Sequence, residues 1–205
     1  MIPFMRRAVY FIRDSKQLAA LASAARQEIV DVLAEMGTVS IAELAATLGR
    51  PADALYFHVR RLTQVGLVRP EGYRSRGGRK EALYRTAEPE LMLQYDPQHP
   101  ATRKAVSAIV ASMLRLGIRD FGRALQRGDV VVSGPQRELW ALRATGRLSP
   151  KQIAGVNRSI QRLKDSVSNP QQRGRLYAVT ILLTPLDRSR SSDASAKPKR
   201  KGRKP

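Results

Sequence analysis

Residues 40–86 constrain the fold more than any other part of the chain, because two helix signals and a hairpin signal follow one another there. Ser40 and Glu43 have the spacing of a capping box, in which the serine hydroxyl accepts from the Glu43 N–H and the glutamate carboxylate accepts from the Ser40 N–H. The next apolar residues recur at the spacing of one helix face. Gly49 then ends this first helix, and Pro51 opens a second one at a position where a missing N–H costs little.

The second helix, over residues 51–65, is amphipathic, and a hairpin signal follows it. Its buried face is marked by four apolar residues at helical spacing, Leu55, Val59, Leu62 and Val65. Two β-prone segments, 67–68 and 82–84, flank a basic, glycine-containing stretch at 72–80, which predicts two strands joined by a loop. Helix, turn, helix and hairpin in this order make the winged helix-turn-helix pattern, whose second helix fits the major groove of DNA.

Residues 21–86 resemble the ArsR-like winged helix-turn-helix transcriptional regulators of bacteria and archaea. The resemblance rests on four stretches of sequence, LASAARQEI at 21–29, IAELA with a following Leu48-Gly49 at 41–49, LYFHVRRL at 55–62 and VGLV at 65–68. It implies a DNA-binding domain and a role in the regulation of transcription. Family members that sense metals often use paired cysteines, and since this chain has no cysteine, the resemblance implies no thiolate metal sensor.

The positive charge of the chain is concentrated on the second helix and the hairpin. The net charge at pH 7 is +20, yet residues 15–49 sum to −2. Residues 50–85 hold nine basic and three acidic residues and therefore carry +6. A basic surface on a helix-turn-helix and its hairpin indicates contact with the phosphates of double-stranded DNA.

We predict DNA contacts on both of these elements. On the face of the second helix opposite to its apolar residues, Ala52 or Phe57 is expected to meet a thymine methyl group, and Arg60 a guanine edge or a phosphate. In the hairpin, basic residues beside Gly77-Gly78 are expected to clamp phosphates or to enter a narrow minor groove. The full set of predicted contacts is Ser40, Arg50, Ala52, Asp53, Tyr56, Phe57, Arg60, Arg61, Arg74, Arg76, Arg79 and Lys80.

The residues before this unit are expected to complete its core. Ala8 to Ile12 is short and β-prone and is interpreted as a strand or an arm. Asp14 to Gln17 is a second capping box, and the helix that it opens runs to Gly37. This helix is expected to pack across the helix-turn-helix pair as the third helix of the core. Its acidic residues are interpreted as a solvated face: Glu28, Asp31 and Glu35.

The residues after the hairpin are interpreted as a connector, a long helix and a smaller unit. Three prolines mark residues 89–100 as the connector. Residues 101–127 are expected to form a helix whose broad apolar stripe needs cover from a second layer or a second subunit. Beyond it we expect strands at 129–133 and 176–184, and between them a helix opened by a third capping box at 149–152.

The fold class that follows is mainly α (α+β). Its expected parts are a winged helix-turn-helix domain at 1–88, the connector at 89–100, a helical or α+β dimerisation or effector region at 101–187, and a basic tail at 188–205. The tail has no large apolar residue and cannot bury enough surface to offset the entropy of ordering, so we expect it to be disordered. We interpret it as a tether to DNA that does not read sequence, with a plain solubilising extension as the alternative.

The chain carries no catalytic constellation, so we expect no enzymatic activity, no cofactor and no metal site. It has two histidines and no cysteine, and no serine lies in a nucleophile elbow. His58 is interpreted as partly buried and hydrogen-bonded, and Trp140, Tyr177 and Tyr95 as core aromatics in preference to a ligand pocket. No apolar run is long enough to cross a bilayer, and the lack of cysteine agrees with a reducing compartment, so we expect a cytoplasmic, nucleoid-associated protein.

Three functions are compatible with these features. The first is a homodimeric, sequence-specific, DNA-binding regulator of transcription, with its two recognition helices in successive major grooves and a dimer built on the helix at 101–127. The second is a nucleoid-associated or RNA-binding protein that uses charge without reading bases. The third is a winged-helix protein-interaction module that has lost DNA binding. The agreement between the fold signature and the charge distribution favours the first.

Overall fold

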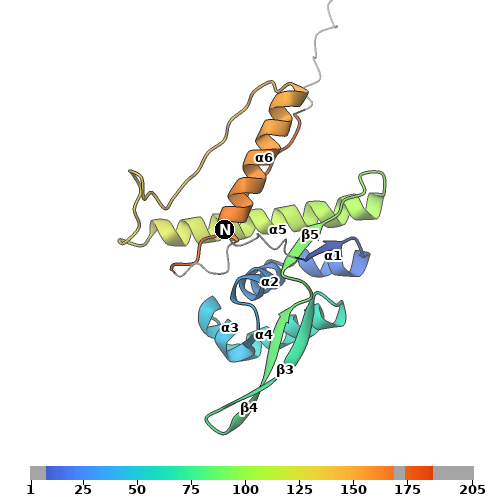
Figure 1. Ribbon diagram of the computed structural model, residues 1–205, viewed down its shortest axis with the longest axis vertical. Helices are drawn as coiled ribbons and strands as arrows, with labels where there is room; N and C mark the ends of the chain where they lie inside the picture. Colours follow the sequence, from blue (N-terminus) through green and yellow to red (C-terminus); the bar gives the residue numbers. More distant parts are fainter. Residues whose placement is uncertain (1–7, 169–173, 187–205) are drawn as a thin grey trace, which may run out of the picture.

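The structure is a computed structural model that describes residues 8–168 and 174–186 (Figure 1). Its elements in chain order are β1 (Val9–Ile12), α1 (Ser15–Leu21), α2 (Ala24–Met36), β2 (Val39–Ser40), α3 (Ile41–Leu48), α4 (Ala52–Gln64), β3 (Val68–Arg76), β4 (Arg79–Thr86), β5 (Glu90–Leu93), α5 (Pro100–Leu125) and α6 (Pro150–Val167). This mixture of helices and small sheets confirms the α+β class and the order helix, turn, helix, hairpin.

The core lies where α1, α2, α3 and α4 meet, beside an antiparallel sheet of β2, β4 and β3 in that order. The largest apolar side chains that it buries completely come from β1, from all four helices and from the start of β3: Ile12, Leu18, Ile29, Leu33, Leu44, Leu55, Val59, Leu62, Leu67 and Val68. Each of them contributes about 1.5–3 kcal/mol on leaving water, so this cluster stabilises the unit that carries α4 and the hairpin.

The prediction of one long first helix is wrong, because the chain divides it into α1 and α2. Ser23 adopts an extended backbone with φ −100° and ψ 125° and caps α2. Asp14 caps α1 as predicted, by accepting from the N–H groups of Lys16 and Gln17. The Gln17 side chain does not complete a capping box but donates to the Val65 carbonyl at 2.9 Å, because a buried amide needs a partner inside the core.

A strand lies inside the segment that was predicted to be a connector. β5 pairs in parallel with β1, so that Val9 lies opposite Glu90 and Ile12 lies opposite Leu93. Ile12 is buried in the core, and the apolar residues of β5 pack against it. This pairing brings the chain back to its N-terminal side, and α5 then runs across α1 and α2 (Figure 1).

The long helix predicted at 101–127 is α5, and only part of its apolar stripe is covered. Ile109 and Ser112 are buried against the domain, and the Gln27 side chain of α2 donates to the Ile109 carbonyl at 3.0 Å. Farther along the helix, Ile118 is 73% exposed and Leu125 is also exposed. The second layer predicted for this stripe is therefore incomplete within one chain. None of the helices in residues 8–168 or 174–186 has the length and apolarity needed to cross a membrane.

The helix predicted after the third capping box is α6, and the two strands predicted on either side of it are wrong. Ser149 and Gln152 close the capping box in both directions. Residues 129–133 and 176–184 contain no strand, and all their large apolar side chains except Val130 are exposed. A β-prone segment forms a strand only where another strand offers N–H and C=O groups. The predicted basic tail at 188–205 lies outside the described residues.

Candidate nucleic-acid interface

α4 presents one side to the core and the other to solvent. Leu55 and Val59 are each 1% exposed and Leu62 is 0% exposed, whereas Tyr56 is 55% and Phe57 is 69% exposed on the opposite side. The other predicted contacts along this outer side are exposed as well: Asp53, Arg60 and Arg61. Aromatic and arginine side chains together on an exposed surface are typical of a binding site.

α3 and the turn after it determine where α4 points. The Ser40 hydroxyl accepts from the Glu43 N–H at 3.3 Å, and Glu43 Oε2 accepts from the Ser40 N–H at 2.9 Å, so the capping box is confirmed. Gly49 ends α3 with φ +61°, a left-handed conformation that glycine adopts without steric cost. Pro51 follows as the N-cap of α4, so the second helix predicted at 51–65 is confirmed within a residue at each end.

Two of the residues predicted to contact DNA, Ser40 and Ala52, are partly or wholly buried inside the domain. Ser40 is 2% exposed, and both its hydroxyl and its N–H take part in the cap of α3. Its prediction as a DNA contact is therefore corrected, because a buried hydroxyl that already has its partner cannot reach a phosphate. Ala52 is half-buried and packs against the core at the start of α4, so only part of its surface is open to a base.

Arg50, in the turn before α4, is not a free cation. Its Nη2 lies 2.5 Å from Glu28 Oε2, and the other carboxylate oxygen of Glu28 lies 2.5 Å from Nη2 of Arg119 on α5. The prediction that Glu28 lies on a solvated acidic face is wrong, since its side chain is largely buried between these two guanidinium groups. The carboxylate therefore ties the turn before α4 to α5.

The hairpin after α4 is more regular than the sequence predicted. β3 and β4 pair as far as Arg76 and Arg79, so the prediction of a loop over 72–80 is wrong. Gly77 and Gly78 alone make the turn, with φ +55° and φ +75°. Two successive positive φ angles are what a type I′ turn requires, and this turn matches the twist of the two strands that it joins. The hairpin projects from the domain as a wing (Figure 1).

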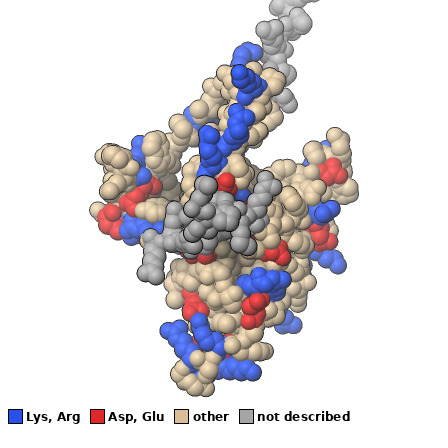
Figure 2. Space-filling view, viewed as in Figure 1, with Lys and Arg blue, Asp and Glu red and all other residues tan. Residues whose placement is uncertain are grey.

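Three of the predicted cations lie at the tip of this wing. Arg76, Arg79 and Lys80 are exposed, and Lys and Arg gather at this end of the molecule, at the bottom of the view in Figure 2. Lys80 Nζ lies 4.2 Å from the centre of the Tyr73 ring, a cation–π contact that holds the ammonium group beside the strand. The tip therefore presents positive charge on a hairpin that packs against α4.

Arg74, the fourth predicted cation of the wing, is placed differently. Its Nη2 lies 2.8 Å from Glu43 Oε1 and 3.3 Å from Glu81 Oε2. Two carboxylates therefore engage this guanidinium group, which was predicted to bind a phosphate. The sequence predicts Glu43 only as a capping residue, and no local signal pairs it with a hairpin residue so far along the chain.

His58 lies at the edge between the exposed and buried sides of α4. Its ring meets the Phe57 ring edge-on, with the centroids 5.6 Å apart. The predicted hydrogen bond is not found at Nδ1, which is buried and has no partner among the described residues. Burial lowers the pKa of His58, and the positive charges of Arg26 and Arg50 lower it further. The imidazole is therefore mainly neutral at pH 7 and adds no charge to this surface.

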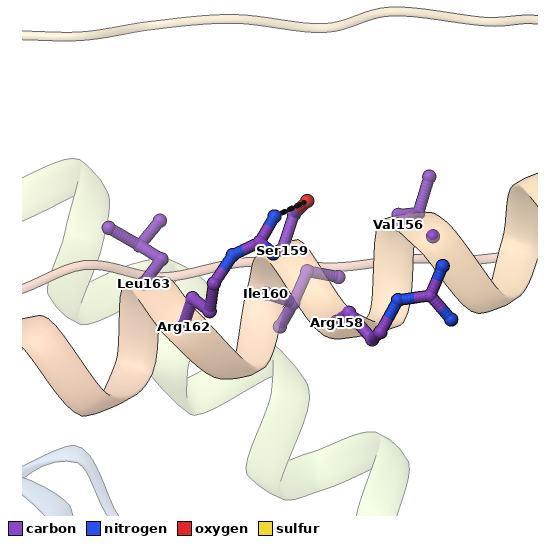
Figure 3. Close-up of a pocket in the computed structure, with 7 residues that line it drawn as sticks. Val156, Arg158, Ser159, Ile160, Arg162 and Leu163 are labelled. Atoms are coloured by element: carbon purple, nitrogen blue, oxygen red, sulfur yellow. Dashed lines mark hydrogen bonds between the residues drawn. The ribbon is translucent and has the colours of Figure 1, made fainter.

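The aromatic residues of the C-terminal part form neither a core nor a shared pocket. Trp140, Tyr177 and Tyr95 are all exposed, so the prediction that they are core residues is wrong. An open depression of about 580 Å³ lies along α6, and that helix alone lines it. In Figure 3, Val156 and Leu163 project from the same side of α6 with no second wall close to them. This is an uncovered helix face and not a ligand pocket.

The N-terminal part of the chain is similar to known helix-turn-helix proteins. Residues 21–71 match the family model of a helix-turn-helix domain. Among solved structures, a protein named as a possible transcriptional regulator for arsenical resistance is 26% identical over 54% of this chain and 93% of that one, with a TM-score of 0.29. RV1404 from Mycobacterium tuberculosis is 15% identical over 77% of this chain and 86% of that one, with a TM-score of 0.30. No curated protein matches the chain.

The family match and the fold identify the same elements. TM-scores of 0.29 and 0.30 are too low to support an argument from those two structures. Residues 21–71, however, contain α2, α3, α4 and the start of the wing, in the order that the sequence predicted. Residues 21–71 therefore belong to a helix-turn-helix domain, and the hairpin of β3 and β4 that follows α4 makes it a winged one.

Proposed function

We propose that the chain is a homodimeric regulator of transcription that reads specific sequences in double-stranded DNA with α4 and holds phosphates with the wing. The observation that carries this proposal is the outer side of α4, where Tyr56, Phe57 and Arg60 are exposed on a helix whose inner side chains are each 1% exposed or less. A helix anchored in this way presents its outer side chains to a major groove without reorganisation. A protein with this activity is expected to be cytoplasmic and associated with the nucleoid.

The side chains on α4 offer three kinds of contact to base edges. Arg60 can donate two hydrogen bonds to a guanine, and Asp53 can accept one from a cytosine amino group. Phe57 offers an apolar surface for a thymine methyl group. We assign Tyr56 and Arg61 to the flanks of the same groove, because they extend the exposed side of the helix. Selection of bound sites from a random duplex pool tests this assignment, with a defined half-site as the expected result.

The wing is expected to supply phosphate contacts that do not depend on sequence. Changing Arg76→Gln or Arg79→Gln should reduce the slope of log affinity against log salt concentration by about 0.9 for each phosphate that the wing no longer neutralises. The affinities for preferred and random duplexes should fall by the same factor, because a phosphate carries no base identity. Fluorescence anisotropy titrations over a range of salt concentrations measure both quantities. An unchanged slope in both variants contradicts the assignment of the wing tip.

A second copy of the chain is the proposed cover for the uncovered apolar surface of the C-terminal part. Within the described residues, seventeen of the twenty-four exposed large apolar side chains lie in residues 114–186. Large exposed apolar patches are typical of interaction surfaces, and a stable interface buries about 800 Å² on each partner. The row on α5 that includes Leu114, Ile118 and Leu125 is exposed on a regular helix, so we place the dimer contact there.

Placing a carboxylate in this row is expected to separate the dimer. Ile118→Asp should shift the protein from dimer to monomer in sedimentation velocity, because an unpaired charge in an apolar interface costs several kcal/mol. It should also weaken binding to a duplex with two half-sites far more than binding to a single half-site. Gln126→Asp, which puts the same carboxylate at the end of α5, serves as the control. A dimer that survives Ile118→Asp contradicts this interface.

Nonspecific binding of nucleic acid is the second candidate function, and the net charge of +20 favours it. Competition of the preferred duplex with random duplex distinguishes nonspecific from sequence-specific binding, since a specificity ratio near one indicates a protein that uses charge alone. Absence of duplex binding at low salt would favour a protein-interaction module.

The similar protein of arsenical resistance lends no effector to this proposal, because a chain without cysteine has no thiolates for a soft metalloid.

A further inference from the structure

One carboxylate of α3 is shared between the cap of that helix and the wing. Glu43 Oε2 accepts from the Ser40 N–H at 2.9 Å, while Glu43 Oε1 lies 2.8 Å from Arg74 Nη2. The same Nη2 lies 3.3 Å from Glu81 Oε2, and Arg74 and Glu81 are directly opposite each other in β3 and β4. Arg74 therefore joins the two strands of the wing to the first turn of α3.

This link lies where the wing has little other support. The third strand of the sheet, β2, is two residues long and pairs only with Leu83 and Tyr84. From there to the turn, β3 and β4 pair only with each other. A two-stranded hairpin is marginally stable by itself, so its direction depends on side-chain contacts with the rest of the domain. The pair of Glu43 with Arg74 is such a contact between α3 and this outer part of the wing.

The charges of this cluster argue against a direct role in holding DNA. The hydrogen bond from Arg74 lowers the pKa of Glu43, and the N–H of Ser40 lowers it further. The hydrogen bond with Glu43 raises the pKa of Arg74. Glu43 and Arg74 are thus both charged at pH 7, and one arginine with two carboxylates has a formal net charge of −1. Such a group repels phosphate, unlike the cations at the tip of the wing.

We propose that Glu43 is a wing-positioning residue that acts through Arg74, and that Arg74 holds the wing against α3 instead of contacting a phosphate. This inference rests on the proposed function, because it states how the wing is aimed at the DNA that α4 reads. Glu43 bears a negative charge, which by itself would repel DNA. According to this proposal, Glu43 nevertheless increases the affinity for DNA.

The sign of one substitution separates this proposal from simple electrostatics. Glu43→Gln removes a negative charge from the DNA-binding side, so electrostatics alone predicts tighter binding. The positioning role predicts weaker binding, by about two- to fivefold, because one half-exposed ion pair is lost. Glutamine also serves at this position of a capping box, so α3 keeps its cap. Glu71→Gln is the matched control, since Glu71 pairs with Arg85 at 2.6 Å inside the wing and does not reach α3.

The experiment compares these variants in the full-length chain. Anisotropy titrations with the preferred duplex are expected to show weaker binding for Glu43→Gln, and equal or tighter binding for Glu71→Gln. Adding Arg74→Gln to Glu43→Gln is expected to cause no further loss, because the link is already broken. Equal or tighter binding by Glu43→Gln overturns the proposal. A further loss of affinity in the double variant, together with a smaller salt slope, also overturns it, because Arg74 would then be a phosphate contact.

A second measurement without DNA keeps this test independent of the proposed function. Amide hydrogen exchange of the free protein reports the opening of the wing directly. Glu43→Gln is expected to speed exchange at residues 73–82 and to leave α4 unchanged, while Glu71→Gln leaves the rate at the tip unchanged. Unchanged exchange at 73–82 in Glu43→Gln overturns the positioning role. Failure of the wild-type chain to bind any duplex instead overturns the proposed function, whatever the exchange rates show.

Discussion

Replacing Arg60 by alanine is expected to weaken binding to the preferred duplex by about 1–3 kcal/mol, which is roughly 5- to 150-fold in affinity. Arg60 is exposed on the outer side of α4, one turn after Tyr56, and a guanidinium group in the major groove forms a bidentate contact with a guanine. The loss should be largest for the selected sequence and small for random duplex, because the second contains no defined partner for this side chain. The specificity ratio should therefore fall together with the affinity.

Competition titrations with labelled preferred duplex and unlabelled random duplex measure both quantities for the variant. Arg115→Ala is the control, because Arg115 is an exposed arginine of α5, which lies across the domain from the wing (Figure 1). It removes the same charge and should leave the specificity ratio unchanged. A sequence-independent loss for Arg60→Ala, equal on both duplexes, would show that Arg60 contacts a phosphate and that another residue of α4 reads the base.

Shortening Leu62 to alanine is expected to lower the free energy of unfolding by about 2–5 kcal/mol. Leu62 is 0% exposed and lies on the inner side of α4. Its removal costs the transfer energy of the lost methyl groups and leaves a cavity that the surrounding core side chains fill only in part. Since domains of this size have total stabilities of about 5–15 kcal/mol, the variant should unfold at a markedly lower urea concentration, which circular dichroism measures.

Leu142→Ala gives the matched comparison for this core substitution. Leu142 is 83% exposed in the described segment between α5 and α6, and the same change there should alter stability by no more than about 0.5 kcal/mol. Equal effects at the two positions would contradict the burial of the inner side of α4. DNA binding by Leu62→Ala should recover at lower temperature, since the outer side chains that contact DNA are intact.

The helix-turn-helix could be predicted from the sequence because its signals are local. The capping box of Ser40 and Glu43, the glycine at the end of α3 and the apolar spacing of α4 each involve residues within one or two helical turns. The interruption before α2 was missed because the apolar spacing continues across Ser23 while the backbone there is extended. The strand β5 was missed because its partner β1 lies far away in the sequence, and no local pattern specifies a parallel pair.

Some features of the candidate interface could likewise be predicted from the sequence, and others could not. That α4 and the wing are basic and exposed follows from composition and spacing, and the structure agrees for Arg60 and for the cations at the wing tip. Which arginines are available does not follow from them. Arg50 and Arg74 belong to the same basic stretch, yet both are held by carboxylates from other elements. Residues 176–184 show the same limit, because a strong β propensity gives no strand where no neighbouring strand lies beside it.

The order of residues along the chain is enough to specify where α3 and α4 begin and end and which side of α4 is buried. Helix caps, glycine turns and helical periodicity depend only on neighbouring residues, so a short stretch of sequence is enough to specify them. Which charged side chains face solvent, and how the wing is attached to α3, depend instead on the packing of the whole domain. An ion pair such as Glu43 with Arg74 forms between elements that packing brings together, and its energy depends on a distance that no local pattern contains.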